Sequence, residues 1–205
     1  MGEIIMRRML VTKIPLVSLI AIAVAGFGSA AVAHVGDHSH MTLAEGLRHP
    51  FTGLDHLLAM VAVGLWASQL GRPALWLLPL TFPAVMVLGA AFGISGRELP
   101  LVEIAIAGSV LVLGAAIALA YRPSLVVGVG LIALFALAHG YSHGVALPAS
   151  VSGLTFGIGF VATTLMLHAI GISLGMLANR VPLRYAARTA GAVIAAFGVF
   201  ILATI

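Results

Sequence analysis

Six long apolar runs, separated by short polar breaks, fill most of the chain after residue 53. They are residues 54–70, 74–92, 101–120, 125–143, 151–177 and 185–205. Each is close to the ~20 residues that a helix needs to cross the hydrocarbon core of a bilayer. Breaks as short as residues 71–73 and 121–123 allow only tight turns, so neighbouring helices must be antiparallel. The pattern predicts an all-α integral membrane protein: residues 49–205 form one domain, a bundle of six transmembrane helices.

The start of the chain has the pattern of a secretory signal peptide. Arg7, Arg8 and Lys13 precede an apolar stretch over residues 14–27, and residues 31–33 (AVA) form a small-residue cleavage site. We therefore predict that residues 1–33 are a cleaved N-terminal signal peptide, with an uncleaved first membrane helix as the alternative. Either way, residue 34 emerges on the far side of the membrane.

Residues 34–48 are polar and are predicted to form a His-rich periplasmic segment. Such a tract can hold a divalent metal, although a solvated tail with incidental histidines explains the same residues. Its candidate ligands are His34, Asp37, His38 and His40.

Composition supports the membrane assignment and limits the chemistry. The 205 residues are 61% hydrophobic and 8% charged, whereas a soluble domain has about 25% charged residues. The net charge of +4 is too small and scattered for nucleic-acid binding. Without cysteine, disulfides, thiolate metal sites and thiol catalysis are excluded. Eight histidines then favour borderline or harder divalent ions over Cu(I).

Basic residues predict the orientation, because they favour cytoplasmic ends of spans. With the mature N-terminus outside, five arginines fall at cytoplasmic ends, and only Arg48 and Arg97 fall outside. The five are Arg72, Arg122, Arg180, Arg184 and Arg188. We therefore expect a multi-pass protein of the bacterial cytoplasmic (inner) membrane with both mature termini periplasmic.

The stretch HPFTGLDH, residues 49–56, precedes and opens the first span. A carboxylate and an imidazole there, Asp55 and His56, are costly in lipid and typical of function. On a straight helix, His49 and His56 would lie about 10 Å apart along the axis, too far to share an ion. Pro50 and Gly53 supply the means for a bend that brings them together. We predict a metal site here.

The fourth run contains a second polar pair, His139 and His143. They are four residues apart, so on a helix they lie on one face, close enough to share an ion. We predict that they join His49, Asp55 and His56 as metal ligands. Two histidines bonded to backbone carbonyls in a packed bundle are the alternative.

Two further polar residues are candidate auxiliary ligands. Glu103 opens the third run at the same predicted membrane side as the two histidine motifs. His168 lies well inside the fifth run, nearer the predicted cytoplasmic side. It is either a deeper relay site or a polar histidine of the core.

These motifs resemble those of the HupE/UreJ family of membrane proteins. Residues 49–56 are similar to the family's HPxxGxDH element, and residues 139–144 (HGYSHG) to its HGxAHG element, with Ser142 in place of Ala. The resemblance covers the whole chain and implies a nickel or cobalt permease linked to hydrogenase or urease maturation. The family's second motif usually continues to a Glu, where this chain has Ala146, and Glu103 is a candidate substitute.

The residues and the resemblance together favour a secondary transporter. We expect a permease that imports Ni²⁺ or Co²⁺, without enzymatic activity, a permanently bound cofactor or ATP hydrolysis. The alternatives are a haem- or zinc-binding membrane enzyme or redox protein, and a metal-binding accessory subunit without transport. Residues 139–143 lack the Glu of a His-Glu-x-x-His zinc hydrolase.

Overall fold

The computed structural model describes residues 42–147, 153–178 and 184–205. The predicted signal peptide and the candidate ligands His34, Asp37, His38 and His40 lie outside the described residues. Throughout the described part, the regular elements are helical. In chain order they are α3 (Leu43–Arg48), the 3₁₀ helix η1 (His49–Phe51), α4 (Leu54–Leu70), α5 (Ala74–Ile94), α6 (Val102–Ala118), α7 (Leu125–Ala146), α8 (Gly153–Ala178) and α9 (Arg184–Thr204).

The predicted runs appear as helices α4 to α9, with ends shifted by a few residues. In the described ranges, four helices are long and apolar enough to cross a membrane: α5, α7, α8 and residues Tyr185–Thr204 of α9. The segment Leu43–Phe51 and α4 form a pair bent by 82°, which makes a fifth if it is counted as one span. Helix α6 has 17 residues because Leu101 and Ala120, with φ of 62° and 51°, interrupt it at both ends.

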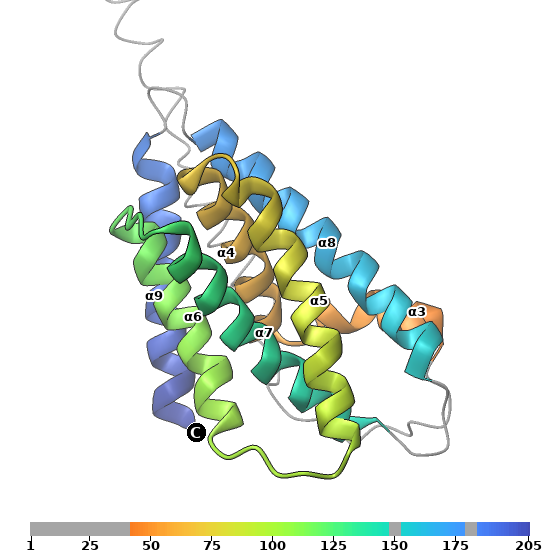
Figure 1. Ribbon diagram of the computed structural model, residues 1–205. Coiled ribbons are helices and arrows are strands. Elements are labelled where there is room, and N and C mark those ends of the chain that lie inside the picture. Colours follow the sequence, from red (N-terminus) through yellow and green to blue (C-terminus); the bar gives the residue numbers. More distant parts are fainter. Residues whose placement is uncertain (1–41, 148–152, 179–183) are drawn as a thin grey trace, which may run out of the picture. The chain divides into compact units, whose positions relative to one another are not determined.

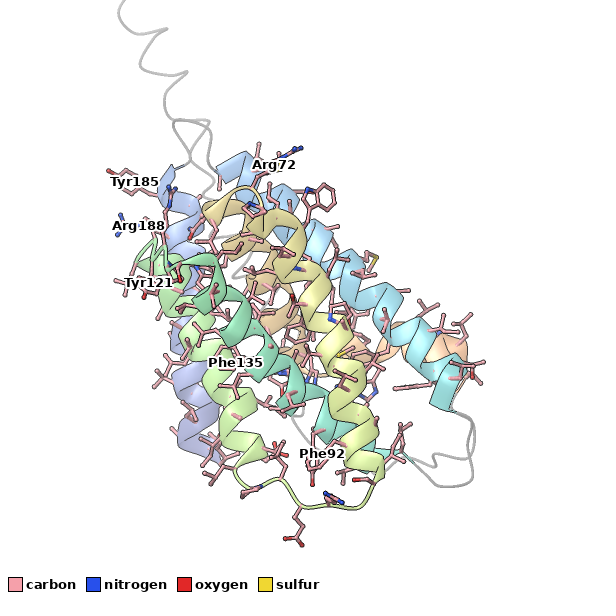
Figure 2. All side chains as sticks on the ribbon, in the orientation of Figure 1. Arg72, Phe92, Tyr121, Phe135, Tyr185 and Arg188 are labelled. Atoms are coloured by element: carbon pink, nitrogen blue, oxygen red, sulfur yellow. The ribbon has the colours of Figure 1, made fainter. Side chains whose placement is uncertain are left out.

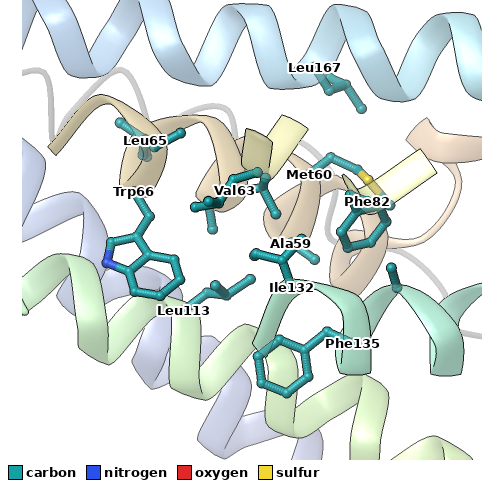
Figure 3. Close-up of a cluster of buried hydrophobic side chains, with 14 of the residues drawn as sticks. Ala59, Met60, Val63, Leu65, Trp66, Phe82, Leu113, Ile132, Phe135 and Leu167 are labelled. Carbon is teal, nitrogen blue, oxygen red and sulfur yellow. The ribbon is translucent and has the colours of Figure 1, made fainter. Parts of the chain in front are cut away.

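Helix α4 occupies the centre of the bundle (Figure 1). It packs against α5, α6 and α8, and nearly every residue from Ala59 to Gln69 is buried. Its Val63 and Trp66 lie among apolar side chains from the surrounding helices, including Leu113, Ile132 and Phe82 (Figure 3). An uninterrupted apolar run therefore becomes a buried helix, as expected for one that is hydrophobic all round.

Glycines bring two helix pairs into close contact. A Cβ at Gly140 or Gly144 of α7 would collide with the backbone of α5, at the carbonyls of Met86 and Ala90. A Cβ at Gly171 of α8 would likewise meet the backbone of α4. Small residues at these positions therefore let the backbones of α7 and α8 approach those of α5 and α4 closely.

The two ends of the bundle can be identified by the residues and helix ends that lie there (Figure 2). Arg72, Tyr121 and Arg188 lie at one end, called here the Arg72 end. The opposite end carries η1, the start of α4 and the ends of α5 and α7, and is called the η1 end.

The two tryptophans do not both lie in an interfacial belt, as tryptophans near the end of a span are expected to do. Trp76 is 63% exposed, but Trp66 is 0% exposed. The Trp66 indole Nε1–H donates to the carbonyl oxygen of Tyr121 at 3.0 Å, which satisfies its polar atom inside the core.

Candidate metal site

The bend expected between Pro50 and Gly53 is present, and it creates the site. Pro50 lies in η1, and Gly53 is the extended N-cap residue of α4, with φ −110° and ψ 122°. A Cβ on Gly53 would lie 2.6 Å from Asp55 Oδ1 and 3.2 Å from His56 Nδ1. A side chain at position 53 would therefore displace the Asp55 carboxylate or the His56 ring, which fold back over Gly53.

The bend lets His49 and His56 reach the same partner on α7. The ring centroid of His143 lies 4.9 Å from that of His49 and 4.6 Å from that of His56. His139, one turn below His143, lies 4.8 Å from His56. The structure thus gathers His49, His56, His139 and His143, which we call the imidazole cluster.

Hydrogen bonds determine which nitrogen of His56 carries a proton. Asp55 Oδ1 lies 3.1 Å from His56 Nδ1, and a carboxylate accepts, so Nδ1 carries the hydrogen. In the neutral ring, Nε2 then has the lone pair and faces His143 Nε2 at 2.8 Å. Asp55 Oδ1 also accepts the His56 backbone N–H at 2.9 Å. A carboxylate behind an imidazole is the arrangement that orients metal-binding histidines.

His139 presents a second lone pair to the interior. Its Nδ1–H donates to the Phe135 carbonyl at 2.9 Å, so the lone pair of the neutral ring is on Nε2. This atom is buried and has no hydrogen-bond partner among the described residues. An unsatisfied buried polar atom costs about 1–3 kcal/mol, which a purely structural histidine would avoid by pairing both nitrogens.

Within the imidazole cluster, His56 and His143 are joined by a hydrogen bond, and the other neighbouring pairs are in ring contact. Among the residues that the structure describes, no three His, Asp or Glu side chains converge as the ligands of one ion would. The His56–His143 contact of 2.8 Å is shorter than the ~3.3 Å between two nitrogens that bind one tetrahedral ion at about 2.0 Å. If the two nitrogens moved about 0.5 Å farther apart, their spacing would suit two ligands of one ion.

A hollow of about 220 Å³ opens onto His49 and His143 at the η1 end. Its other lining residues are Glu45, Arg48, Thr52, Ala146 and Phe156. Glu45 is the carboxylate of this lining, and it was not among the ligands predicted from the sequence. The signal was the spacing of four residues between Glu45 and His49, which places them on one side of a helical segment.

The candidate auxiliary ligands lie away from the cluster. Glu103 lines a different hollow, with Leu99 and Leu202, so the structure does not bring it to Ala146. His168 is buried on α8 and contacts Phe82, whose ring centroid lies 5.5 Å from both His139 and His168.

Aromatic rings cover the cluster from α8, and they too were missed. Phe160 lies 4.5 Å from His143 and 5.6 Å from His49, and Phe156 lies 5.4 Å from His49, all between ring centroids. These rings shield the imidazoles on the α8 side. In sequence, they could not be distinguished from ordinary core residues.

Together, fold and site define a multi-pass helical membrane protein with a buried polar centre built mainly from imidazoles. The chain belongs to the HupE/UreJ family: the family model "HupE / UreJ protein" matches residues 22–201. It is 46% identical over 177 residues to Protein HupE of Rhizobium leguminosarum bv. viciae, across 85% of this chain and 91% of that protein. No solved structure matches the chain significantly.

Proposed function

We propose that this protein is a permease that imports Ni²⁺ or Co²⁺ across the bacterial cytoplasmic membrane through six membrane-crossing helices. The main observation in support of the proposal is the contact between His56 and His143, two imidazoles from different helices. Asp55 is hydrogen-bonded to the other nitrogen of His56. A neutral imidazole pair suits borderline divalent metals, and the absence of cysteine from the sequence disfavours softer ions.

The ligands of the transported ion are His49, His56, His139 and His143, with Asp55 either binding directly or orienting His56. Support comes from their geometry: His143 contacts both His49 and His56, and His139 adds a buried nitrogen below them. Incomplete ligation suits transport, because an ion held by a closed protein shell could not exchange its ligands quickly.

The hollow at the η1 end is the route by which the ion reaches the cluster. It reaches His49 and His143, and its lining includes the carboxylate of Glu45 together with the guanidinium of Arg48. In this proposal the η1 end faces the periplasm, where residues 34–40 capture the ion, and the Arg72 end faces the cytoplasm. The arginines at the Arg72 end support that direction.

Family membership supports a role for this import in hydrogenase or urease maturation.

The alternative hypothesis, that the protein binds haem, is disfavoured by the geometry of the site. His56 and His143 lie within hydrogen-bonding distance, which leaves no space for a porphyrin plane between their nitrogens.

Radioactive Ni²⁺ and Co²⁺ uptake in cells that lack their own importers tests the proposal. The parent protein is compared with Asp55→Ala and His56→Ala at equal amounts of membrane-inserted protein. We expect uptake by the parent and its loss in both variants. No uptake of either ion by the inserted parent would contradict the proposal, and a Soret band in the purified protein would favour a haem protein.

A further inference from the structure

We propose that His168 and Thr164 of α8 form an inner exchange site, which accepts the transported ion after it leaves the imidazole cluster. The inference rests on the proposed import function and deepens it. It assigns a second position on the ion's path, between the cluster and the Arg72 end.

His168 has one nitrogen fixed and the other unused. Its side chain is 1% exposed, and Nδ1 lies 3.2 Å from the carbonyl oxygen of Pro79 on α5. That carbonyl is available because residue 83, which would donate to it in a regular helix, is a proline without an N–H. A carbonyl only accepts, so Nδ1 carries the hydrogen and the lone pair of the neutral ring is on Nε2.

Two polar atoms of α8 lack a partner at this level. His168 Nε2 and Thr164 Oγ1 are both buried without a hydrogen-bond partner in the described part of the chain. Thr164 is 0% exposed and precedes His168 by one helical turn, so both side chains lie on one face. A threonine in a helix can satisfy its hydroxyl on its own backbone, and Ser109 does so with the carbonyl of Ile106.

The position of His168 continues the line of the cluster inward. Along α5, Gly144 packs at Ala90, Gly140 packs at Met86, and His168 bonds to Pro79. At 1.5 Å per residue, Pro79 is about 16 Å nearer the Arg72 end than Ala90. Phe82 contacts both His139 and His168, and its ring centroid lies 5.5 Å from each of the two imidazole rings. Two imidazoles that each have an unpartnered nitrogen therefore contact the same phenyl ring.

The ligand set of this inner site suits release. One imidazole nitrogen and one neutral hydroxyl oxygen provide fewer and weaker ligands than the cluster, so water must complete the coordination of Ni²⁺ or Co²⁺. An ion that passes Phe82 therefore moves from several imidazoles to one, and its dissociation becomes easier. The backbone at this level is held firmly, because a Cβ at Gly64 of α4 would collide with the His168 carbonyl.

Experiments on the purified full-length protein, with Co²⁺ alone as the probe, can distinguish an effect on ion binding from an effect on ion transport. Equilibrium binding is measured in detergent, and Co²⁺ flux is measured in proteoliposomes. The variants are His168→Gln, which keeps a donor for Pro79, and Thr164→Val, which removes only the hydroxyl. Ser109→Ala is the matched control, because it removes a buried hydroxyl that is satisfied within α6.

We expect both α8 variants to bind Co²⁺ with an affinity within about threefold of the parent, since the cluster is intact. Flux should fall about tenfold or more in His168→Gln, the scale of losing a group that supports a metal, and less in Thr164→Val. Parental flux in both variants would overturn the inner site while leaving the import function standing. No flux in the parent would instead overturn the proposed function. Equal losses of flux in Ser109→Ala would also overturn the inner site.

Discussion

The Nε2 atoms of His56 and His143 lie 2.8 Å apart, although 87 residues separate them in the chain. Two local features make this contact. Gly53 allows the chain to turn before α4, and glycines of α7 hold that helix directly against α5. The position of each ring is thus determined by backbone packing, and Asp55 and Phe160 further restrict the two rings.

Replacing His143 should strongly weaken metal binding. His143 contacts both His49 and His56, so His143→Ala removes both contacts, and the contact of His56 with His139 remains. We expect the affinity for Co²⁺ to fall by about 100-fold or more, beyond the 10–100-fold of an outer-shell change.

Tyr141→Phe is the control for that substitution. The Co²⁺ affinity of both variants is measured by equilibrium dialysis. The Tyr141 hydroxyl donates to the Arg97 carbonyl at 2.8 Å and accepts the Leu99 N–H at 2.9 Å, so it holds a loop and no histidine. Its loss should lower thermal stability and leave Co²⁺ affinity unchanged. Equal affinity losses in Tyr141→Phe and His143→Ala would contradict the assignment.

Asp55 can act as a ligand or as the group that orients His56, and two substitutions distinguish these roles. Asn keeps an oxygen that accepts from His56 Nδ1–H, whereas Ala removes it. If Asp55 orients His56, Asp55→Asn should cost about tenfold in Co²⁺ affinity and Asp55→Ala up to about 100-fold. Equal losses in the two variants, measured by titration of the purified protein, would favour direct ligation instead.

Glu45, rather than Glu103, should assist capture of the ion. Glu45→Gln removes the negative charge from the lining of the hollow, which also contains Arg48, yet it preserves the capping box with Thr42, since Gln serves at this position as well as Glu. We expect the KM for uptake to rise a few-fold at low salt, as for loss of an exposed attractive charge, and the difference to shrink at high salt. Glu103→Gln is the control and should leave KM unchanged.

The close packing of α7 on α5 should be sensitive to a single methyl group. Gly140→Ala places a Cβ against the Met86 carbonyl, so the helices must separate, at a cost of about 1–3 kcal/mol. Gly157→Ala on α8 is the control, because its Cβ meets nothing within 4 Å. Thermal unfolding in detergent should show a lower midpoint for Gly140→Ala only, and a similar drop in both would contradict this packing.

Metal uptake should weaken as the pH falls. A histidine binds metal through the lone pair of its neutral ring, and an unperturbed imidazole has a pKa of about 6.5. Protons therefore compete with the ion, and uptake at a clamped membrane potential should decrease between about pH 7.5 and 5.5. Uptake that stays constant over this range would contradict ligation by imidazole.

The sequence predicted the helices well because each apolar run is long and its breaks contain Gly or Pro. The bend before α4 could also be predicted, since Pro50 and Gly53 both disfavour a straight helix. The length of α6 could not, because nothing in the local pattern marks Leu101 and Ala120 as residues with positive φ. The burial of Trp66 could not be predicted either, because its hydrogen-bond partner, the Tyr121 carbonyl, is 55 residues away in the chain.

For the candidate site, the sequence identified the histidines and Asp55 but not their arrangement. Residue type and spacing were enough to select His139 and His143, because both residues lie on one face of the same helix. The shared contacts of His143 with His49 and His56 depend on how α7 meets the bend, which is a tertiary property. Glu103 was selected because it opens a span near the same end, whereas Glu45, which lines the hollow, was overlooked.

Ion flux through the purified protein directly tests whether the imidazole cluster supports transport. Proteoliposomes that contain a trapped Ni²⁺-sensitive chelator are prepared with the parent, His56→Ala or Tyr141→Phe, and external Ni²⁺ is added at fixed potential. We expect a rapid signal with the parent and with Tyr141→Phe, and a signal near that of empty liposomes with His56→Ala. A parental rate in His56→Ala, or no signal from correctly inserted parent with either Ni²⁺ or Co²⁺, would contradict it.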